Sequence, residues 1–234
     1  MPLKNKRVLV TGGTGALGSF LCERFLQEQM KVAATYRSEE KRASFPQFIA
    51  KNALLIKADV SNENDVRRLF DDVVSNFGGV DIVVNTVGGY IPTKHLTEVS
   101  TEEWERMMNI NLRSTFLCTR EALKKMKGNS YGRIMNMSAK IGLHPTPGRV
   151  AYAISKAGVN MLTEIIAQEL KGTGITINAI APSIIDTAAN RESMPDEDHS
   201  TWVKPQTIAD MILHLCSEEA GQISGNIIKV YGGV

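Results

Sequence analysis

The chain has 234 residues, with 27 basic residues against 25 acidic ones and a formal net charge of +2. This length suits one α/β domain with a sizeable core, so we expect residues 1–234 to form a single domain. The charges are spread without long runs, which argues against nucleic acid or a membrane surface as a partner and favours a small-molecule substrate.

The sequence contains no evident targeting segment or cysteine framework. The first apolar run ends at Val10, far short of a signal peptide, and no stretch approaches the ~20 apolar residues that span a bilayer. Cys22, Cys118 and Cys216 are odd in number and far apart, so we expect buried or half-buried reduced thiols. The four histidines lack ligand spacing. We therefore expect a cytoplasmic protein without a bound metal.

Apolar runs of strand length alternate with longer stretches of helical period, which is typical of βα units and a parallel sheet. The expected strands cover residues 8–10, 32–35, 54–58, 82–85, 133–137, 175–180 and 227–230. The expected helices cover residues 17–29, 65–77, 100–126, 151–170 and 208–216, and Ser100 with Glu103 indicates a capping box at the third of them. This order predicts a doubly wound parallel α/β sheet of about seven strands, with helices on both faces and a ligand crevice at the carboxyl ends of the strands.

A glycine-rich segment, TGGTGALG, directly follows the first strand and opens the first helix. Its Gly12, Gly15 and Gly18 have the spacing GxxGxxG. Glycines at such a turn let backbone N–H groups approach a pyrophosphate at the positive end of the helix. Glycines also serve ordinary turns, but the position between a strand and a helix favours a dinucleotide-binding loop.

The end of the second strand carries no carboxylate. Dinucleotide sites commonly place an acidic residue there to bind the adenosine ribose. This sequence has Tyr36, Arg37 and Ser38 instead, and Arg37 is well placed to meet a 2′-phosphate. We therefore expect NADP(H), with NAD(H) as the other cofactor considered. The alternative for Arg37 is a solvated surface charge.

Tyr152 and Lys156 are four residues apart in the expected helix 151–170, so they lie on one face. A phenol with a pKa of ~10 is a poor acid near neutrality, and a nearby ammonium lowers that pKa by favouring the phenolate. Tyr152 then becomes a usable general acid for the atom that receives a proton after hydride transfer. Chance alone readily supplies this spacing, so its meaning depends on the rest of the chain.

That context resembles the short-chain dehydrogenase/reductase family from end to end. The motifs are TGGTGALG, Asp59 after the third strand, NTVGG from Asn85, NINL with Asn111, GRIMNMS, YAISK and INAIAPSIIDT. The resemblance implies a Rossmann fold and an NAD(P)-dependent oxidoreductase with Tyr152 and Lys156 as its catalytic pair. It also implies a homo-oligomer, dimer or tetramer, built on the long helices.

The resemblance assigns roles to individual residues. Asp59 and Val60 would border the adenine, Thr187 would lie near the carboxamide, and Asn111 would hold a water that links Lys156 to solvent. The residues expected to bind the cofactor are Gly12, Thr14, Gly15, Ala16, Leu17, Gly18, Arg37, Asp59, Val60, Asn85, Tyr152, Lys156, Pro182, Ile185 and Thr187. A segment at about 186–203 would form a lid over the substrate, the alternative being a surface loop with Trp202 packed at a helix start. Tyr90 is either a pocket residue or a packed aromatic.

The segment after the fifth strand departs from the family pattern. The serine that usually binds the substrate carbonyl corresponds to Ala139, and Ser138 precedes it by one residue. Adjacent side chains of a strand point to opposite faces, so Ser138 replaces that serine only if the strand is irregular. Ser138 is retained as a candidate catalytic residue.

A narrower resemblance accounts for the alanine. The stretches GALGS, VGGY, SAKIGLHPTPG and DTAANRESMPDEDHSTW are similar to segments of dihydropteridine reductases, which also carry alanine at that position. Against this resemblance, Asn111 follows the pattern of the general family, and Tyr36 and Arg37 stand where those reductases have the acidic residue of an NADH-preferring site. We therefore expect hydride transfer from NAD(P)H to a small carbonyl or quinonoid, dihydropteridine-like substrate. The alternatives are a 3-oxoacyl or other ketone reductase and a non-catalytic NADP-binding regulator.

Overall fold

The computed structural model describes residues 3–233 and contains one sheet of seven parallel strands. In chain order the strands are β1 (Arg7–Thr11), β2 (Lys31–Tyr36), β3 (Leu54–Lys57), β4 (Ile82–Asn85), β5 (Gly132–Met137), β6 (Ile175–Pro182) and β7 (Ile227–Val230). The bounds of β4 and β7 agree with the apolar runs, and the others differ by one or two residues at an end. Aliphatic residues fill these strands because helices cover both faces of the sheet.

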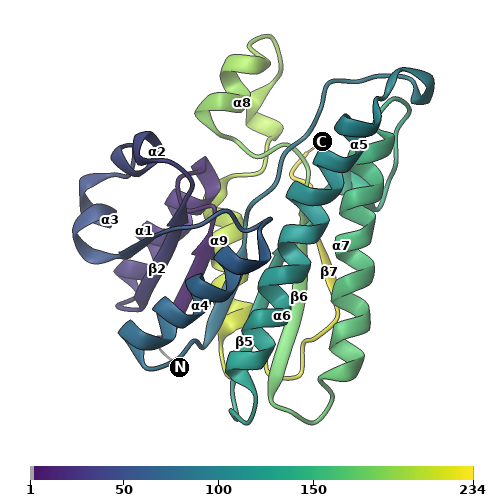
Figure 1. Ribbon diagram of the computed structural model, residues 1–234. Helices are drawn as coiled ribbons and strands as arrows, with labels where there is room; N and C mark the ends of the chain where they lie inside the picture. Colours follow the sequence, from purple (N-terminus) through teal and green to yellow (C-terminus); the bar gives the residue numbers. More distant parts are fainter. Residues whose placement is uncertain (1–2, 234) are drawn as a thin grey trace.

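The spatial order of the sheet is β3-β2-β1-β4-β5-β6-β7. Strand β1 pairs with β2 on one side and with β4 on the other, so the strand order reverses at β1. A doubly wound sheet opens a ligand crevice at the carboxyl ends of its strands at such a point. The expected doubly wound Rossmann-type fold is confirmed. In Figure 1, helix α8 (Ala188–Ser193), which follows β6, projects beyond this end of the sheet.

Two layers of helices enclose the sheet. Helices α1 (Ala16–Gln27) and α9 (Pro205–Cys216) pack in one hydrophobic core. Helices α4 (Glu63–Phe77), α6 (Ser114–Met126) and α7 (Val150–Glu169) pack in the other, in front of the sheet in Figure 1. The apolar stripe expected for 65–77 is confirmed, because the residues that α4 buries are Val66, Leu69, Phe70 and Val73. The free thiols of Cys22, Cys118 and Cys216 are buried, as expected.

The long helix expected over 100–126 is interrupted. Its capping box is confirmed, because Ser100 Oγ accepts from the Glu103 N–H at 3.2 Å and Glu103 Oε2 accepts from the Ser100 N–H at 3.0 Å. Helix α5 (Thr101–Met107) then passes into a π-helical segment, η2 (Met108–Arg113), before α6 begins. A wider turn changes the direction of the side chains without breaking the apolar pattern, so the sequence did not indicate it.

The sequence pattern did not predict the short helices. The helices α2 (Glu39–Ala43) and α3 (Gln47–Asn52) and the helix α8 lie where none was expected, because five or six residues are too few to display a helical period. Single 3₁₀ turns occur at η1 (Leu96–Glu98), η3 (Lys140–Gly142) and η4 (His199–Thr201). Within residues 3–233, no helix has the length and apolarity to cross a bilayer, and no three His, Cys, Asp or Glu side chains cluster as metal ligands do.

Candidate active site

The glycine-rich loop has the geometry of a phosphate cradle. Gly12 has φ = +71° and donates its N–H to Thr35 Oγ1 at 2.8 Å, which ties the loop to β2. A Cβ added at Gly18 would lie 2.2 Å from the Gly12 carbonyl oxygen, so loop and helix meet where only glycine fits. Gly15 caps α1 without a side-chain acceptor, which leaves the first-turn N–H groups for a ligand. The loop therefore fits a pyrophosphate.

The predicted loop residues surround this cradle. Thr14 and Leu17 are half-buried, whereas Gly15 and Ala16 are exposed at the start of α1. At a helix amino terminus, main-chain N–H groups rather than side chains would meet a phosphate. The residues that the sequence singled out here are thus brought together by a single turn.

Arg37 and Asp59 follow the carboxyl ends of the neighbouring strands β2 and β3. Arg37 is exposed and has no hydrogen bond or ion pair to the described residues. The Asp59 carboxylate accepts from the Ser61 N–H at 2.9 Å and from Ser61 Oγ at 2.6 Å, so its direction is set locally. Val60 is buried in the core between the sheet and α4. One unpaired cation and one oriented carboxylate therefore flank the crevice.

Lys156 is held at both of its ends by the carboxyl end of β5. Its ammonium donates to the Met137 carbonyl oxygen at 2.8 Å, and its own carbonyl oxygen accepts from Ser138 Oγ at 3.3 Å. The side chain is buried, and this desolvation lowers the pKa of Lys156 from 10.5 to about 8. The hydroxyl of Ser138 thus contacts the backbone of α7, a contact that suits a role in positioning Lys156.

The position of the family's carbonyl-binding serine carries only a methyl group. Ala139 is extended, with φ = −161° and ψ = 159°, so its side chain leaves the opposite face from that of Ser138. The regular alternation expected from the sequence is therefore present. Ser138 does not turn toward the face of Ala139, because its hydroxyl is engaged with Lys156 in α7.

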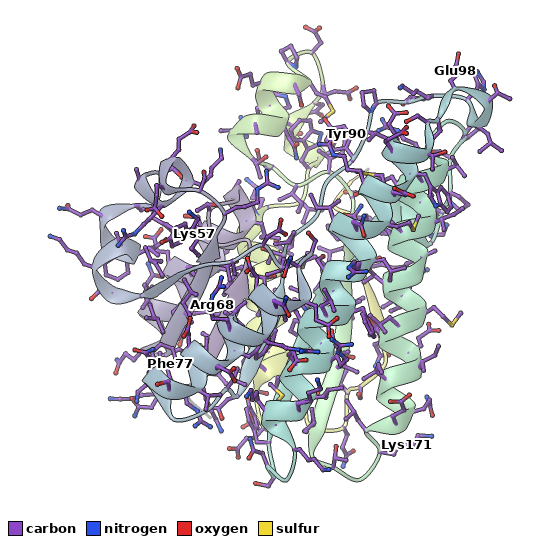
Figure 2. The ribbon with its side chains drawn as sticks, viewed as in Figure 1. Lys57, Arg68, Phe77, Tyr90, Glu98 and Lys171 are labelled. Carbon is purple, nitrogen blue, oxygen red and sulfur yellow. The ribbon has the colours of Figure 1, made fainter. Side chains whose placement is uncertain are left out.

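Tyr152 lies in the first turn of α7 and is half-buried. Burial is the main influence on its hydroxyl and raises the pKa of Tyr152, while the positive charge of Arg149 acts in the opposite direction. The expectation that Lys156 lowers this pKa is not met here, because Lys156 directs its ammonium to β5. Tyr90, which follows β4, places its ring 6.5 Å from the ring of Tyr152 and is visible at the upper end of the molecule in Figure 2.

The π-helical segment carries Asn111 into the site. The side-chain amide of Asn111 forms two hydrogen bonds with the backbone of Gly89. Its oxygen accepts from the Gly89 N–H and its nitrogen donates to the Gly89 carbonyl oxygen, both at 2.9 Å. It also donates to Ser155 Oγ at 3.0 Å. A Cβ added at Gly88 would lie 2.9 Å from Asn111 Oδ1 and 3.2 Å from Lys156 Nζ. The sequence-predicted Asn111 and Lys156 are thus neighbours, across a position that has room only for glycine.

A buried polar network behind the site was missed in the sequence. Asn85 Nδ2 donates to Asn136 Oδ1 at 2.9 Å, and Asn136 Nδ2 donates to Thr163 Oγ1 at 3.0 Å. Thr163 in turn donates to the Val159 carbonyl oxygen at 2.8 Å, so the network joins β4, β5 and α7. The sequence did hold one sign of this network, because Asn85 and Asn136 each interrupt an apolar strand, and they lie opposite each other in the sheet. Asn85 Oδ1 is buried without a partner in the described part of the chain.

The segment after β6 carries the last of the predicted site residues. Pro182 ends β6, Ile185 pairs with Val203 in an isolated parallel bridge, and Thr187 caps α8 by accepting from the Asn190 N–H at 3.2 Å. Trp202 is only 4% exposed, and its ring centroid lies 4.3 Å from that of His199. Trp202 therefore anchors the segment close to the start of α9.

Comparisons with known proteins agree with this geometry. The family model described as short chain dehydrogenase matches residues 6–198. Glucose 1-dehydrogenase 2 of Bacillus subtilis (strain 168) is 34% identical, with 99% of this chain and 95% of that protein aligned. The 3-oxoacyl-[acyl-carrier-protein] reductase FabG of Aquifex aeolicus (strain VF5) is 30% identical, with 99% of this chain and 98% of that protein aligned. The solved structure described as ElxO with NADP bound has 30% sequence identity and a TM-score of 0.91, and the match covers 98% of each chain. The chain therefore belongs to the short-chain dehydrogenase/reductase family and is an oxidoreductase.

Proposed function

We propose that the protein is an NADPH-dependent reductase of a small carbonyl or quinonoid, dihydropteridine-like substrate, with Tyr152 as the general acid. The observation that carries this proposal is the fixed position of Lys156, one helical turn after Tyr152, buried against β5 and beside Asn111. NADPH, when bound, supplies the hydride. The protein's own residues supply orientation and the proton.

The proton comes from the hydroxyl of Tyr152. Release of this proton leaves a phenolate, and that charge is opposed by burial and, to a smaller extent, by the neighbouring Tyr90. Two features offset the penalty. The positive end of the 20-residue helix α7 lies at Tyr152, and Arg149 is a nearby cation. Asn111 and Ser138 hold the surrounding backbone, and a water on Asn111 would carry protons onward.

The choice of NADPH over NADH rests on Arg37. The Arg37 guanidinium is exposed and has no carboxylate partner within residues 3–233, so it suits a phosphate, with which it would form charge-assisted hydrogen bonds. The structure described as ElxO with NADP bound supports the same choice. We further propose that the cofactor contacts the loop 12–18, Asp59, Val60, Asn85 and the segment 182–187, and that residues 186–203 cover the substrate.

Two substrate classes compete at this site. Ala139 removes the hydroxyl that would bind a ketone oxygen, which favours a quinonoid ring that needs only hydride and a proton. The similarity to 3-oxoacyl-[acyl-carrier-protein] reductases favours a 3-oxoacyl thioester or another ketone. The non-catalytic regulator is the third possibility, and the intact pair of Tyr152 and Lys156 argues against it.

The test is oxidation of NADPH and NADH by the purified protein with a quinonoid dihydropterin, a panel of ketones and 3-oxoacyl thioesters. Turnover of the pterin alone assigns the Ala139 site to pterin-like substrates. Turnover of ketones means that Tyr152 acts without a serine at that position. Binding of NADPH without turnover of any acceptor contradicts the proposal and supports a regulator.

We expect kcat/KM for NADPH to fall as the pH rises through about 8. Desolvation lowers the pKa of Lys156 to about 8, so the ammonium that would meet the cofactor is lost above that pH. Because kcat/KM reports the groups of the free protein, rates at limiting NADPH from about pH 6 to pH 10 reveal this titration. In Lys156→Arg the guanidinium stays charged, so the fall should disappear from this range. A flat profile in the parent protein contradicts the role of Lys156.

We also propose that the protein forms a homo-oligomer, dimer or tetramer, through α6 and α7. These helices pack together and carry large apolar side chains that are 41% to 57% exposed, namely Phe116, Ile154, Met161 and Ile165. The three α7 residues are spaced seven and four apart, which puts them on one face of the helix. Such an apolar face is typical of an interface between subunits.

Gel filtration with light scattering tests this interface. We expect an oligomer for the parent protein and a monomer for Met161→Glu, because an unpaired buried carboxylate at an interface is strongly unfavourable. The matched control is Phe48→Glu, which changes a 46% exposed aromatic on α3 and should leave the oligomer intact. A monomeric parent protein contradicts the proposal.

A further inference from the structure

A guanidinium without an acidic partner lies beside Tyr152. Arg149 precedes the first turn of α7, is half-buried, and donates from one terminal nitrogen to the Ile91 carbonyl oxygen at 3.3 Å. No carboxylate of the described residues forms an ion pair with it. Its charge nevertheless reaches the hydroxyl of Tyr152, whose pKa burial raises and Arg149 lowers. The cation thus faces the site with hydrogen-bonding capacity to spare.

An exposed aromatic ring completes this corner. Tyr90 is 58% exposed, and the Arg149 guanidinium lies 5.8 Å from the centre of its ring. The rings of Tyr90 and Tyr152 are tilted by 54°, with centroids 6.5 Å apart. Behind them lies an apolar cluster of Ile91, Met107 and neighbours, against which Tyr152 packs. The corner therefore combines an aromatic face, an apolar floor, a proton donor and a cation.

We propose that Arg149 is a specificity-determining residue, which binds a carboxylate of a planar, conjugated substrate while the ring of that substrate packs on Tyr90. This inference rests on the proposed function, because it assigns the substrate of the Tyr152 site. Arg–carboxylate pairs are frequently bidentate and charge-assisted, and aromatic rings favour offset or tilted contacts with other rings.

A small ring can offer one group to each of these residues. Arg149 is the N-cap of α7 and Tyr152 lies in its first turn, so both side chains leave the same end of the helix. A benzene ring with a carbonyl and a carboxylate at para positions would present the carbonyl to Tyr152 and the carboxylate to Arg149. The alternative is that Arg149 only fastens the Ile91 backbone to α7, a role that does not depend on the charge of the ligand.

The experiment uses two probes that differ at one group, 4-formylbenzoate, which is an anion, and its methyl ester, which is neutral. Calorimetry measures their binding to the NADP⁺-loaded protein. We expect the parent protein to bind the anion about tenfold more tightly than the ester, the range expected for one charge-assisted hydrogen bond. Arg149→Gln should remove this preference and Arg149→Lys should keep most of it. Arg106→Gln, which removes an exposed cation on α5, should leave it unchanged.

Equal affinity of the parent protein for both probes overturns the inference, and so does a preference that survives in Arg149→Gln. Tyr90→Leu provides a second variant, which should weaken both probes alike and so keep the anion preference. NADPH oxidation with the two aldehydes separates this test from the proposed function. If the aldehydes are reduced but Arg149→Gln does not change the preference between them, the protein is a reductase and the proposed carboxylate substrate is wrong. If Arg149 sets the preference in binding but no acceptor is reduced, the carboxylate site is correct and the proposed reductase function is wrong.

Discussion

Tyr152→Phe is expected to lower kcat for NADPH-dependent reduction by about 10²- to 10⁴-fold, the usual contribution of a positioned general acid. The substitution removes only the hydroxyl, since the ring can keep its contacts with Ile91 and Met107. KM for NADPH should therefore change little. Steady-state kinetics with the best acceptor of the panel, supported by a thermal melt of both proteins, measures the effect.

The matched control for this prediction is Tyr90→Phe. It removes a phenol hydroxyl from a ring whose centroid lies 6.5 Å from that of Tyr152, in the same corner of the site. We expect kcat to stay within a few-fold of the parent value. If Tyr152→Phe retained full activity, another group would have to deliver the proton, and the proposed acid would be wrong.

Arg37→Asp is expected to raise KM for NADPH by about 10- to 100-fold, which corresponds to the loss of one hydrogen bond to a charged group. The new carboxylate would repel a 2′-phosphate and would suit the free ribose hydroxyl of NADH. The preference between the two cofactors should therefore reverse. The measurement is kcat/KM for NADPH and NADH in the parent and variant proteins.

Lys31→Asp is the matched control, because Lys31 lies exposed at the opposite end of the same strand, β2. It makes the same change of charge far from the carboxyl end of the sheet. Its cofactor preference should equal that of the parent protein. If Arg37→Asp used NADPH as well as the parent does, Arg37 would be only a surface charge.

The geometry around Lys156 explains how a chain without the usual serine can keep an ordered site. Met137 and Ser138 contact the side chain and the carbonyl of Lys156 from the end of β5. The network from Asn85 through Asn136 ties the same region of α7 to the sheet. These contacts orient the pair without a hydroxyl at Ala139. The substrate oxygen, if there is one, would then meet Tyr152 alone.

The sequence by itself determined the features that depend on neighbouring residues. Strand positions follow from short apolar runs, the phosphate loop from its glycine spacing, and the relation of Tyr152 to Lys156 from the helical period. The capping box at Ser100 is local in the same way and was confirmed. Family resemblance added roles for single residues, because their motifs span the whole chain.

Only the tertiary structure decided which distant groups meet. The π-helical turn that delivers Asn111 to Gly89 has the same apolar pattern as an ordinary helix. The contact of Ser138 with Lys156 and the approach of Tyr90 to Tyr152 join segments that are far apart in the chain. Charge effects depend on these distances and on burial, so the pKa of Tyr152 could not be inferred from its spacing to Lys156. Local periodicity carries no information about such contacts, because packing between elements sets them.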